Sequence, residues 1–269
     1  MTIKESLYRF TSDGWCVVEG IIPTNEVGGV RDSVIETMRK AEEESAPPRR
    51  SISEALGTLI NLDQSFASYL ADPRILGVAE ALWGKHVKIT VTTPVVNLPG
   101  NRPQGWHSDW PFNQKHAAHI PAPYPDTPLL MTVIFMLVDF TPENGGTKIV
   151  PGSHRISDNW TSDFGENNLS PHPSEMQVTG TAGSVLMFDS RMWHAVRTND
   201  TDQPRAGVTV RYGPWWLNVN PLVPDSPERE YMVDEQGEPE ANVVYPMPQA
   251  VYDSLQENVK PLFRHWVRG

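Results

Sequence analysis

The chain has 269 residues, enough to bury a sizeable core in one large β-rich domain or in two small ones. Its 33 acidic residues outnumber its 22 basic residues, and the net charge of −11 argues against nucleic acid and anionic membrane surfaces as partners. Cys16 is the single cysteine, which excludes an intrachain disulfide and a thiolate metal cluster. Any metal site must therefore use histidine and carboxylate ligands.

Targeting and linker signals are missing from the sequence. No apolar run reaches the length of a membrane span, and the N-terminus lacks the basic-then-apolar pattern of a signal peptide. We expect a cytoplasmic monomer or homodimer that acts on a small molecule. We expect one domain over residues 1–269, with helices over about 24–84, a β core over about 87–220 and a C-terminal extension and helix over 221–269.

Two helices are predicted near the N-terminus. Apolar residues recur at three- and four-residue steps from Thr24 to about Ala46, which is the period of an amphipathic helix packed on a sheet. Asp72 and Pro73 are a typical N-cap and first residue of a second, short helix, and Gly84 is its predicted end.

The segment from about residue 87 to residue 220 is typical of strands separated by Pro, Gly and Asn clusters. Residues 129–140 are apolar on both faces, as expected of a strand buried in the middle of a sandwich. Further strands are predicted at 87–98, 147–150, 183–189, 193–198 and 205–212. The pattern indicates a mainly β fold, a sandwich or barrel, with helical cover.

The C-terminal part carries a weaker pattern. Residues 224–245 are acidic and contain prolines, so we expect them at the surface. A helix is predicted over about 250–267, interrupted or kinked at Pro261.

His107, Ser108 and Asp109 form a His-x-Asp pattern at strand spacing. Successive side chains of a strand point to opposite faces, so His107 and Asp109 share one face while Trp106, Ser108 and Trp110 share the other. The pair needs one more histidine to complete the facial triad that holds non-heme Fe(II) with coordination positions left open. His-x-Asp alone is a weak signal, because it occurs by chance in many chains.

His194 is the candidate for the third ligand. It follows a strongly apolar strand and a tight turn, and it leads into a predicted hairpin that ends at Arg205. Taken alone, His194 is better interpreted as a hydrogen-bonded core histidine. Together with His107 and Asp109, it is best interpreted as a metal ligand.

Arg205 lies eleven residues after His194, and a turn over 199–204 would fold it back beside the strand that carries His194. A guanidinium there could bind the far end of a small dicarboxylate whose near end chelates the metal, because it meets a carboxylate with two parallel donors. Arg197 and Arg211 are rival candidates. Arg211 is the stronger rival, since it is six residues along the same strand and so on the same face.

The chain resembles the phytanoyl-CoA dioxygenase family of Fe(II)- and 2-oxoglutarate-dependent oxygenases over roughly residues 8–220. The resemblance rests on Gln104, the His107-Ser108-Asp109 pattern, His194 followed by Arg205, and two glycine-containing turns, Pro142-Glu143-Asn144-Gly145-Gly146-Thr147 and Pro151-Gly152-Ser153-His154.

This resemblance implies a double-stranded β-helix core, also called jelly-roll or cupin-like. It implies that His107, Asp109 and His194 bind iron, that Arg205 binds the distal carboxylate of 2-oxoglutarate, and that Gln104 and Thr147 are neighbouring polar contacts. His154 is carried over as a structural residue. The implied reaction uses O₂, converts 2-oxoglutarate to succinate and CO₂, and hydroxylates an unactivated C–H bond. Desaturation or rearrangement stays open as the outcome.

Several alternatives stay open at this point. A halogenase is disfavoured because Asp109 is present where that variant has a small residue. The chain could hydroxylate an acyl-CoA, although Arg49-Arg50 is its only obvious basic pair; a natural product or amino-acid-like metabolite fits better. Trp110, Phe112, Trp215 and Trp216 are candidates for a substrate pocket, with core packing as the alternative.

Two different classes of protein are also possible. One is a non-catalytic β-barrel binding protein with a vestigial metal site, and the other is a cupin with another metal chemistry. The cupin is disfavoured because its two-His-then-Glu pattern on one strand is missing.

Overall fold

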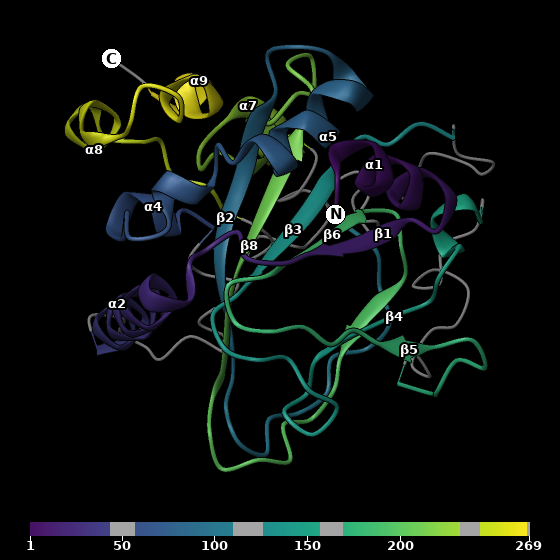
Figure 1. Ribbon diagram of the computed structural model, residues 1–269. Coiled ribbons are helices and arrows are strands. Elements are labelled where there is room, and N and C mark those ends of the chain that lie inside the picture. Colours follow the sequence, from purple (N-terminus) through teal and green to yellow (C-terminus); the bar gives the residue numbers. More distant parts are fainter. Residues whose placement is uncertain (44–56, 110–125, 157–168, 232–242, 268–269) are drawn as a thin grey trace.

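A computed structural model describes residues 1–43, 57–109, 126–156, 169–231 and 243–267. Eight strands form two antiparallel sheets in these parts of the chain (Figure 1). The larger sheet has the order β1-β6-β3-β8-β2 and consists of β1 (Trp15–Val18), β2 (Lys88–Asn97), β3 (Met131–Met136), β6 (Val185–Asp189) and β8 (Arg205–Gly213). The smaller has the order β5-β4-β7 and consists of β4 (Thr147–Ile149), β5 (Met176–Gln177) and β7 (His194–Val196).

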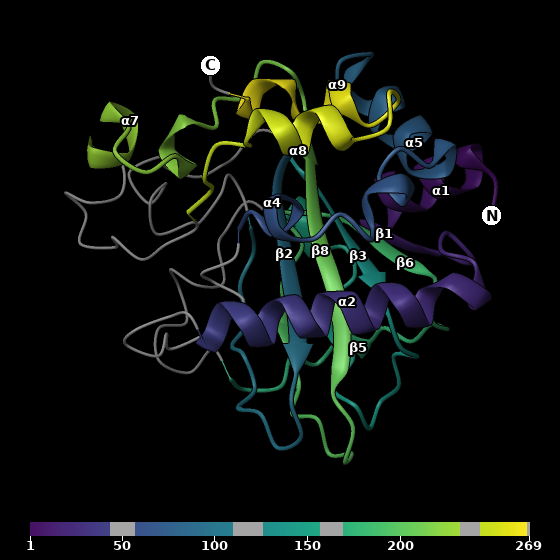
Figure 2. The ribbon, with the colours of Figure 1, turned by 90° about the vertical axis from the view of Figure 1, so that its left-hand side faces the viewer.

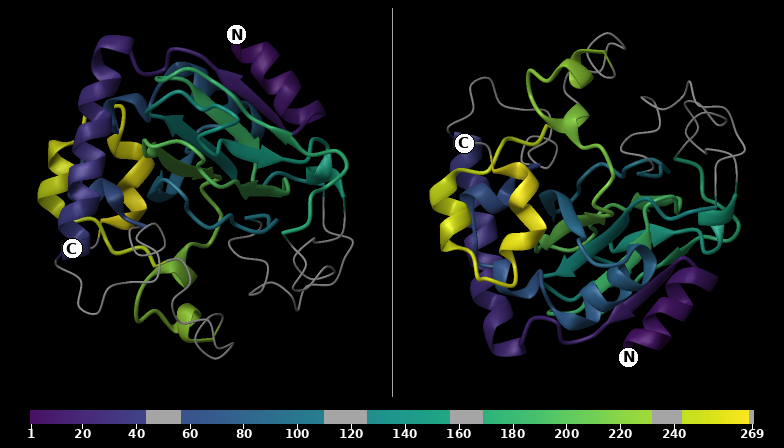
Figure 3. Two further views of the ribbon diagram at one scale, coloured as in Figure 1. Left: turned by 90° about the horizontal axis from the view of Figure 1, so that it is seen from below. Right: turned by 90° about the horizontal axis from the view of Figure 1, so that it is seen from above.

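Helices cover the outer face of the larger sheet (Figure 2). The long α2 (Thr24–Glu43) crosses the sheet, and the other helices are α1 (Ile3–Ser12), α4 (Leu59–Leu62), α5 (Pro73–Trp83), α7 (Pro227–Arg229), α8 (Gln249–Ser254) and α9 (Lys260–Phe263). The smaller sheet lies on the other face of the larger sheet, away from α2, as the views from below and above show (Figure 3). No helix of the described residues is long and apolar enough to span a membrane.

β3 shows why the core has two parts. Met131, Val133 and Phe135 belong to the cluster that packs against the helices, whereas Ile134 and Met136 belong to a second cluster that includes Ile149 of the smaller sheet. All six residues of β3 are buried. The strand is apolar on both faces because it lies between helices and a second sheet, which confirms the prediction for a central strand. The double-stranded β-helix core is confirmed as well.

The N-terminal half of the prediction agrees closely with the structure. Asp72 caps α5 by accepting a hydrogen bond from the Arg74 N–H, Pro73 is in its first turn, and Gly84 ends it. Four elements of this half were not predicted: α1, which begins with a capping box at Thr2 and Glu5, β1, which adds an edge strand to the larger sheet, the short α4, and a 3-10 turn at Ala67–Tyr69. α1 is amphipathic and its capping box is a local signal, so it was predictable, whereas β1 has only four residues and offers little pattern.

The predicted hairpin between the strands of His194 and Arg205 is wrong. β7 pairs with β4, whereas β8 pairs with β2 and β3 in the other sheet. The turn over 199–204 therefore crosses between the sheets instead of folding β8 back onto β7. Crossings of this kind are typical of jelly-roll connections.

The single C-terminal helix is also corrected by the structure. α8 ends at Ser254, Leu255 has an extended backbone, and α9 starts at Lys260. The break precedes Pro261, which lies in the first turn of α9. A proline there costs little, because the first N–H groups of a helix have no partner within the helix.

Candidate active site

His107 and His194 are held side by side by their own backbones. The His107 N–H donates to the His194 carbonyl at 3.0 Å, and the His194 N–H donates to the His107 carbonyl at 2.9 Å. The two imidazole centroids are 4.2 Å apart. His107 joins His194, the first residue of β7, through an isolated bridge, so the segment of His107 is not a regular strand. The predicted alternation of side chains still holds, because Trp106 points away from His107 into a separate cluster with Trp193.

Both rings are oriented by backbone carbonyls. Nδ1–H of His107 donates to the Gly105 carbonyl at 2.9 Å, and Nδ1–H of His194 donates to the Met192 carbonyl at 2.9 Å. These bonds select the tautomer in which Nε2 carries the lone pair needed by a metal. Burial, with His107 nearby, lowers the pKa of His194 to about 4. His194 is therefore neutral at physiological pH and ready to bind a cation.

The two oxygens of Asp109 have different partners. Oδ1 is 2.9 Å from Nη2 of Arg211, and Oδ2 is 3.6 Å from Nε2 of His194. The Asp109 N–H donates to the Ser190 carbonyl at 2.7 Å. Burial opposes the charge on Asp109, but Arg211 and the two imidazoles outweigh it and hold the pKa of the carboxyl below its usual value. The carboxylate is charged at neutral pH, with Oδ2 facing the imidazoles.

One ligand atom from each of His107, Asp109 and His194 can be chosen so that all three lie within 4.8 Å of one another. Two neutral imidazoles and one carboxylate are the donor set of non-heme Fe(II) sites that leave positions open. The predicted convergence of these side chains is confirmed, and the residues fit an iron ion.

Arg205 is buried without a polar partner. Its side chain is 1% exposed, and Nε, Nη1 and Nη2 have no hydrogen-bond acceptor among the described residues. The guanidinium lies over the ring of Phe140, 4.4 Å from the centroid. Burial lowers the pKa of Arg205 to about 10, so it remains a cation at neutral pH. A buried cation without an acceptor is costly, and an anionic ligand would remove that cost.

The rival arginines are engaged elsewhere. Arg197 is exposed at the surface and pairs with Asp200 at 3.0 Å, whereas Arg211 pairs with Asp109. Arg205 and Arg211 are six residues apart on β8, or about 20 Å at the usual rise of a strand. Their backbones therefore lie near opposite ends of β8.

Gln104 and Thr147, the predicted polar contacts, lie beside β7, whereas His154 lies apart from them. Thr147 is buried in β4 and pairs in register with Val196 of β7. Gln104 donates its backbone N–H to the Val196 carbonyl at 2.9 Å, and its side chain is exposed. Both therefore lie next to the strand of His194. His154 is buried and close to Gly14, in keeping with a structural role.

The aromatic candidates divide into two groups. Trp215 and Trp216 are 64% and 50% exposed, so core packing is wrong for both. They directly follow the end of β8 that carries Arg211. Trp110, Phe112 and the basic pair Arg49-Arg50 lie outside the described residues.

Sequence reasoning missed the groups that orient the three proposed ligands. The carbonyls of Gly105, Ser190 and Met192 carry no side-chain signal, so no pattern could have found them. Arg211 was considered only as a rival to Arg205 and not as the partner of Asp109. Its position on the same face of β8 as Arg205 was predictable, but its pairing was not.

Comparisons with known proteins agree with this geometry. The family model "Phytanoyl-CoA dioxygenase (PhyH)" matches residues 10–207. An ectoine dioxygenase from Nocardia farcinica is 28% identical over 237 residues, which cover 76% of each chain. "Dioxygenase af480" from Aspergillus fumigatus is 27% identical over 159 residues, covering 57% of this chain and 46% of that protein.

Solved structures share the fold. HygX from Streptomyces hygroscopicus, with nickel and 2-oxoglutarate bound, has a TM-score of 0.61 at 21% identity, covering 80% of this chain and 88% of that one. The epimerase SnoN from nogalamycin biosynthesis has a TM-score of 0.57 at 22% identity, covering 79% and 83%. The family match, the fold and the histidine and aspartate cluster lead to one conclusion. The chain belongs to the phytanoyl-CoA dioxygenase (PhyH) family and is an iron- and 2-oxoglutarate-dependent dioxygenase.

Proposed function

We propose that the enzyme hydroxylates an unactivated C–H bond of a small natural product or amino-acid-like metabolite, with iron held by His107, Asp109 and His194. The observation that carries the proposal is the convergence of these three side chains, of which Asp109 and His194 are buried and His107 is half-buried, with each Nδ1 already bonded and each Nε2 left for a metal. Bound there, iron supplies the activation of O₂ that couples oxidation of 2-oxoglutarate to oxidation of the substrate.

The protein's own groups would then divide the remaining tasks. Arg205 binds the distal carboxylate of 2-oxoglutarate with two parallel donors, supported by the absence of any other acceptor for its guanidinium among the described residues. Gln104 and Thr147 contribute neighbouring polar contacts, supported by their backbone bonds and register with Val196. Arg211 holds Oδ1 of Asp109 and so leaves Oδ2 for the metal.

The test is iron-dependent consumption of 2-oxoglutarate with release of succinate, measured with and without O₂. We expect slow uncoupled succinate release without an organic substrate and faster release when a library compound is accepted. Tandem mass spectrometry of the accepted compound would then identify an added oxygen atom. A protein that binds 2-oxoglutarate but releases no succinate under any condition would instead be the non-catalytic binding protein.

The charge of the chain bears on the substrate class. An acyl-CoA carries several phosphate charges, which a chain of net charge −11 repels at long range. A neutral or cationic metabolite meets no such barrier. The exposed Trp215 and Trp216, after the Arg211 end of β8, offer flat apolar surface for such a molecule. Faster succinate release with acyl-CoA than with small metabolites would reverse this assignment.

Replacement of Asp109 by glycine or alanine is expected to open a position that chloride can occupy. The change also removes the partner of the Arg211 guanidinium, which is 2.9 Å from Oδ1 of Asp109 and only partly exposed. We expect the absorption spectrum of the anaerobic Fe(II) and 2-oxoglutarate complex to change with chloride in the variant and not in the parent. A variant spectrum that ignores chloride would count against an opened position. Halogenation need not follow, because transfer also depends on where the substrate sits.

A cytoplasmic location, a monomeric or homodimeric state and a single domain over residues 1–269 remain predictions. Size-exclusion chromatography with light scattering would test the oligomeric state.

A further inference from the structure

The turn between β6 and β7 holds two of the three proposed iron ligands through its backbone. The Ser190 carbonyl accepts the Asp109 N–H at 2.7 Å, and the Met192 carbonyl accepts Nδ1–H of His194 at 2.9 Å. The positions of Asp109 and His194 therefore depend on the conformation of this turn. A group that fixes the turn would fix two ligands at once.

Asp189 and Arg191 close this turn with a buried fork. Oδ1 of Asp189 accepts the Arg191 N–H at 2.9 Å and its Nε–H at 3.0 Å, while Oδ2 accepts from Nη2 at 2.8 Å. The two side chains are 1% and 11% exposed. A two-donor pair of this kind is stronger and more directional than a single hydrogen bond. Because the pair is buried, dissolved salt screens it little. The pair therefore restricts the backbone of Ser190, which lies between its two members.

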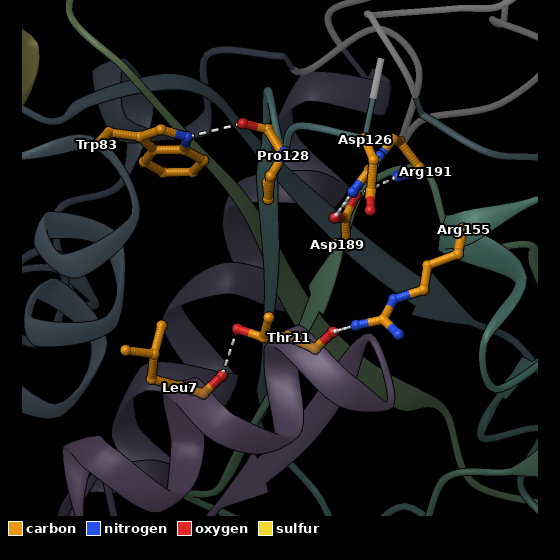
Figure 4. Close-up of polar contacts among 8 residues, drawn as sticks. All are labelled: Leu7, Thr11, Trp83, Asp126, Pro128, Arg155, Asp189 and Arg191. Atoms are coloured by element: carbon orange, nitrogen blue, oxygen red, sulfur yellow. Dashed lines mark hydrogen bonds and ion pairs between the residues drawn. The ribbon is translucent and has the colours of Figure 1, made fainter. Parts of the chain in front are cut away.

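The outer edge of the same guanidinium contacts a second segment (Figure 4). Nη1 of Arg191 is 3.1 Å from Oδ1 of Asp126, whose side chain is 74% exposed. The Ser190 N–H donates to the Leu130 carbonyl at 3.1 Å, and Trp83 donates to the Pro128 carbonyl at 2.7 Å. The segment 126–130 is thus held at several points. The contact of Arg191 to Asp126 is weaker than its contact to Asp189, because Asp126 is exposed and Asp189 is buried.

We propose that Arg191 is a positioning residue for the metal site, acting through Asp189 and the turn backbone on Asp109 and His194. It rests on the proposed function, because it requires that these side chains bind the iron. None of the contacts described for Arg191 reaches His107, Asp109 or His194. Its effect is on where the ligand atoms lie.

The chain contains a matched control for this fork. Asp72 and Arg74 form the same Asp-x-Arg arrangement at the start of α5: Oδ1 of Asp72 accepts the Arg74 N–H at 2.8 Å and its Nε–H at 2.9 Å, and Oδ2 accepts from Nη2 at 2.7 Å. This fork caps a helix and contacts none of the proposed ligands. Arg74→Met removes the corresponding side-chain hydrogen bonds to its aspartate, together with those to the Glu19 and Gly20 carbonyls, without touching the ligand turn.

The test is anaerobic titration of each variant with Co(II) and with Fe(II), together with the Co(II) absorption spectrum and the melting temperature of the metal-free protein. We expect Arg191→Met to bind both metals about 10- to 100-fold more weakly, the usual effect of removing a group that orients ligands. Its Co(II) spectrum should change, because the ligand geometry changes. Arg191→Lys should recover part of the affinity, since a lysine retains one donor to Asp189.

Two controls separate this inference from simple destabilisation. Arg74→Met should lower the melting temperature and leave metal affinity and the Co(II) spectrum as in the parent. Asp126→Asn should also leave both unchanged, because it removes only the exposed contact. If Arg191→Met fails to fold, Arg191→Lys against Asp126→Asn decides: lower affinity in the lysine variant alone supports the proposal.

His107→Ala in the same titration tests the proposed function separately. Parent-like metal affinity in His107→Ala would mean that the iron lies elsewhere, and both proposals would fail. Lost affinity in His107→Ala together with parent-like affinity and spectrum in Arg191→Met would overturn the role of Arg191 alone. Equal losses in Arg191→Met and Arg74→Met would overturn it too, because a general loss of stability would then explain both.

Discussion

Replacing any one of His107, Asp109 and His194 with alanine is expected to reduce turnover below detection while leaving the fold largely intact. One ligand atom of each side chain lies within 4.8 Å of the others, on the side away from the groups that orient it. The β core is held by the two apolar clusters on either side of β3, and a metal site that keeps open positions is not needed to hold such a core together. The measurements are succinate release, Fe(II) affinity and far-ultraviolet circular dichroism.

The three variants should differ in stability in an informative way. Asp109→Ala leaves the largely buried Arg211 guanidinium, 13% exposed, without its carboxylate, so we expect this variant to have the lowest melting temperature of the three. His194→Ala loses only a neutral ring and its bond to the Met192 carbonyl. A fully active Asp109→Ala enzyme would refute the iron assignment, whatever its stability.

Replacing Arg205 with lysine is expected to raise the apparent Michaelis constant for 2-oxoglutarate by roughly 30-fold or more. Lysine keeps the charge but loses the two parallel donors, and truncating one partner of a buried charged pair typically costs about 2 to 5 kcal/mol. The apparent Michaelis constant of the organic substrate and the affinity for Fe(II) should change much less. Titration of 2-oxoglutarate in the succinate assay measures the effect.

Arg211→Lys is the matched comparison, because both arginines lie on β8. The Arg211 side chain pairs with Asp109. We therefore expect Arg211→Lys to bind Fe(II) more weakly and to change the Michaelis constant for 2-oxoglutarate less than Arg205→Lys does. A large defect for 2-oxoglutarate in Arg211→Lys with a near-normal Arg205→Lys would move the carboxylate site to Arg211.

Arg205→Met supplies a readout that does not depend on turnover. The guanidinium is buried without an acceptor among the described residues, so replacing it with an apolar side chain of similar length should raise the melting temperature of the ligand-free protein. Each kcal/mol corresponds to roughly 2–4 °C for a chain of this size. Saturating 2-oxoglutarate, with a metal that does not support turnover, should stabilise the parent and not the variant. A variant that is less stable than the parent and still stabilised by 2-oxoglutarate would argue against the carboxylate site.

Much of this architecture was predictable because it depends on short-range patterns. The period of α2, the Asp72 and Pro73 start of α5, and the apolar run of β3 each report a local preference or a burial state. The convergence of His107 with Asp109 was predictable for the same reason: residues two apart in an extended segment share a face. The third ligand and the arginine were identified by their context and by family resemblance.

The sequence by itself determined the family and the candidate ligands: a single cysteine left histidine and carboxylate for a metal, and the His107-Ser108-Asp109 pattern with His194 and Arg205 indicated the family. Only the tertiary structure decided how they are held. Local pattern favoured a hairpin from His194 to Arg205, but the strands belong to different sheets, because β8 gains more pairing between β2 and β3 than β7 could offer. The same long-range pairing brings Arg211 to Asp109 and leaves Arg205 without an acceptor among the described residues. Such contacts join residues about 100 apart in the sequence, so no local preference encodes them.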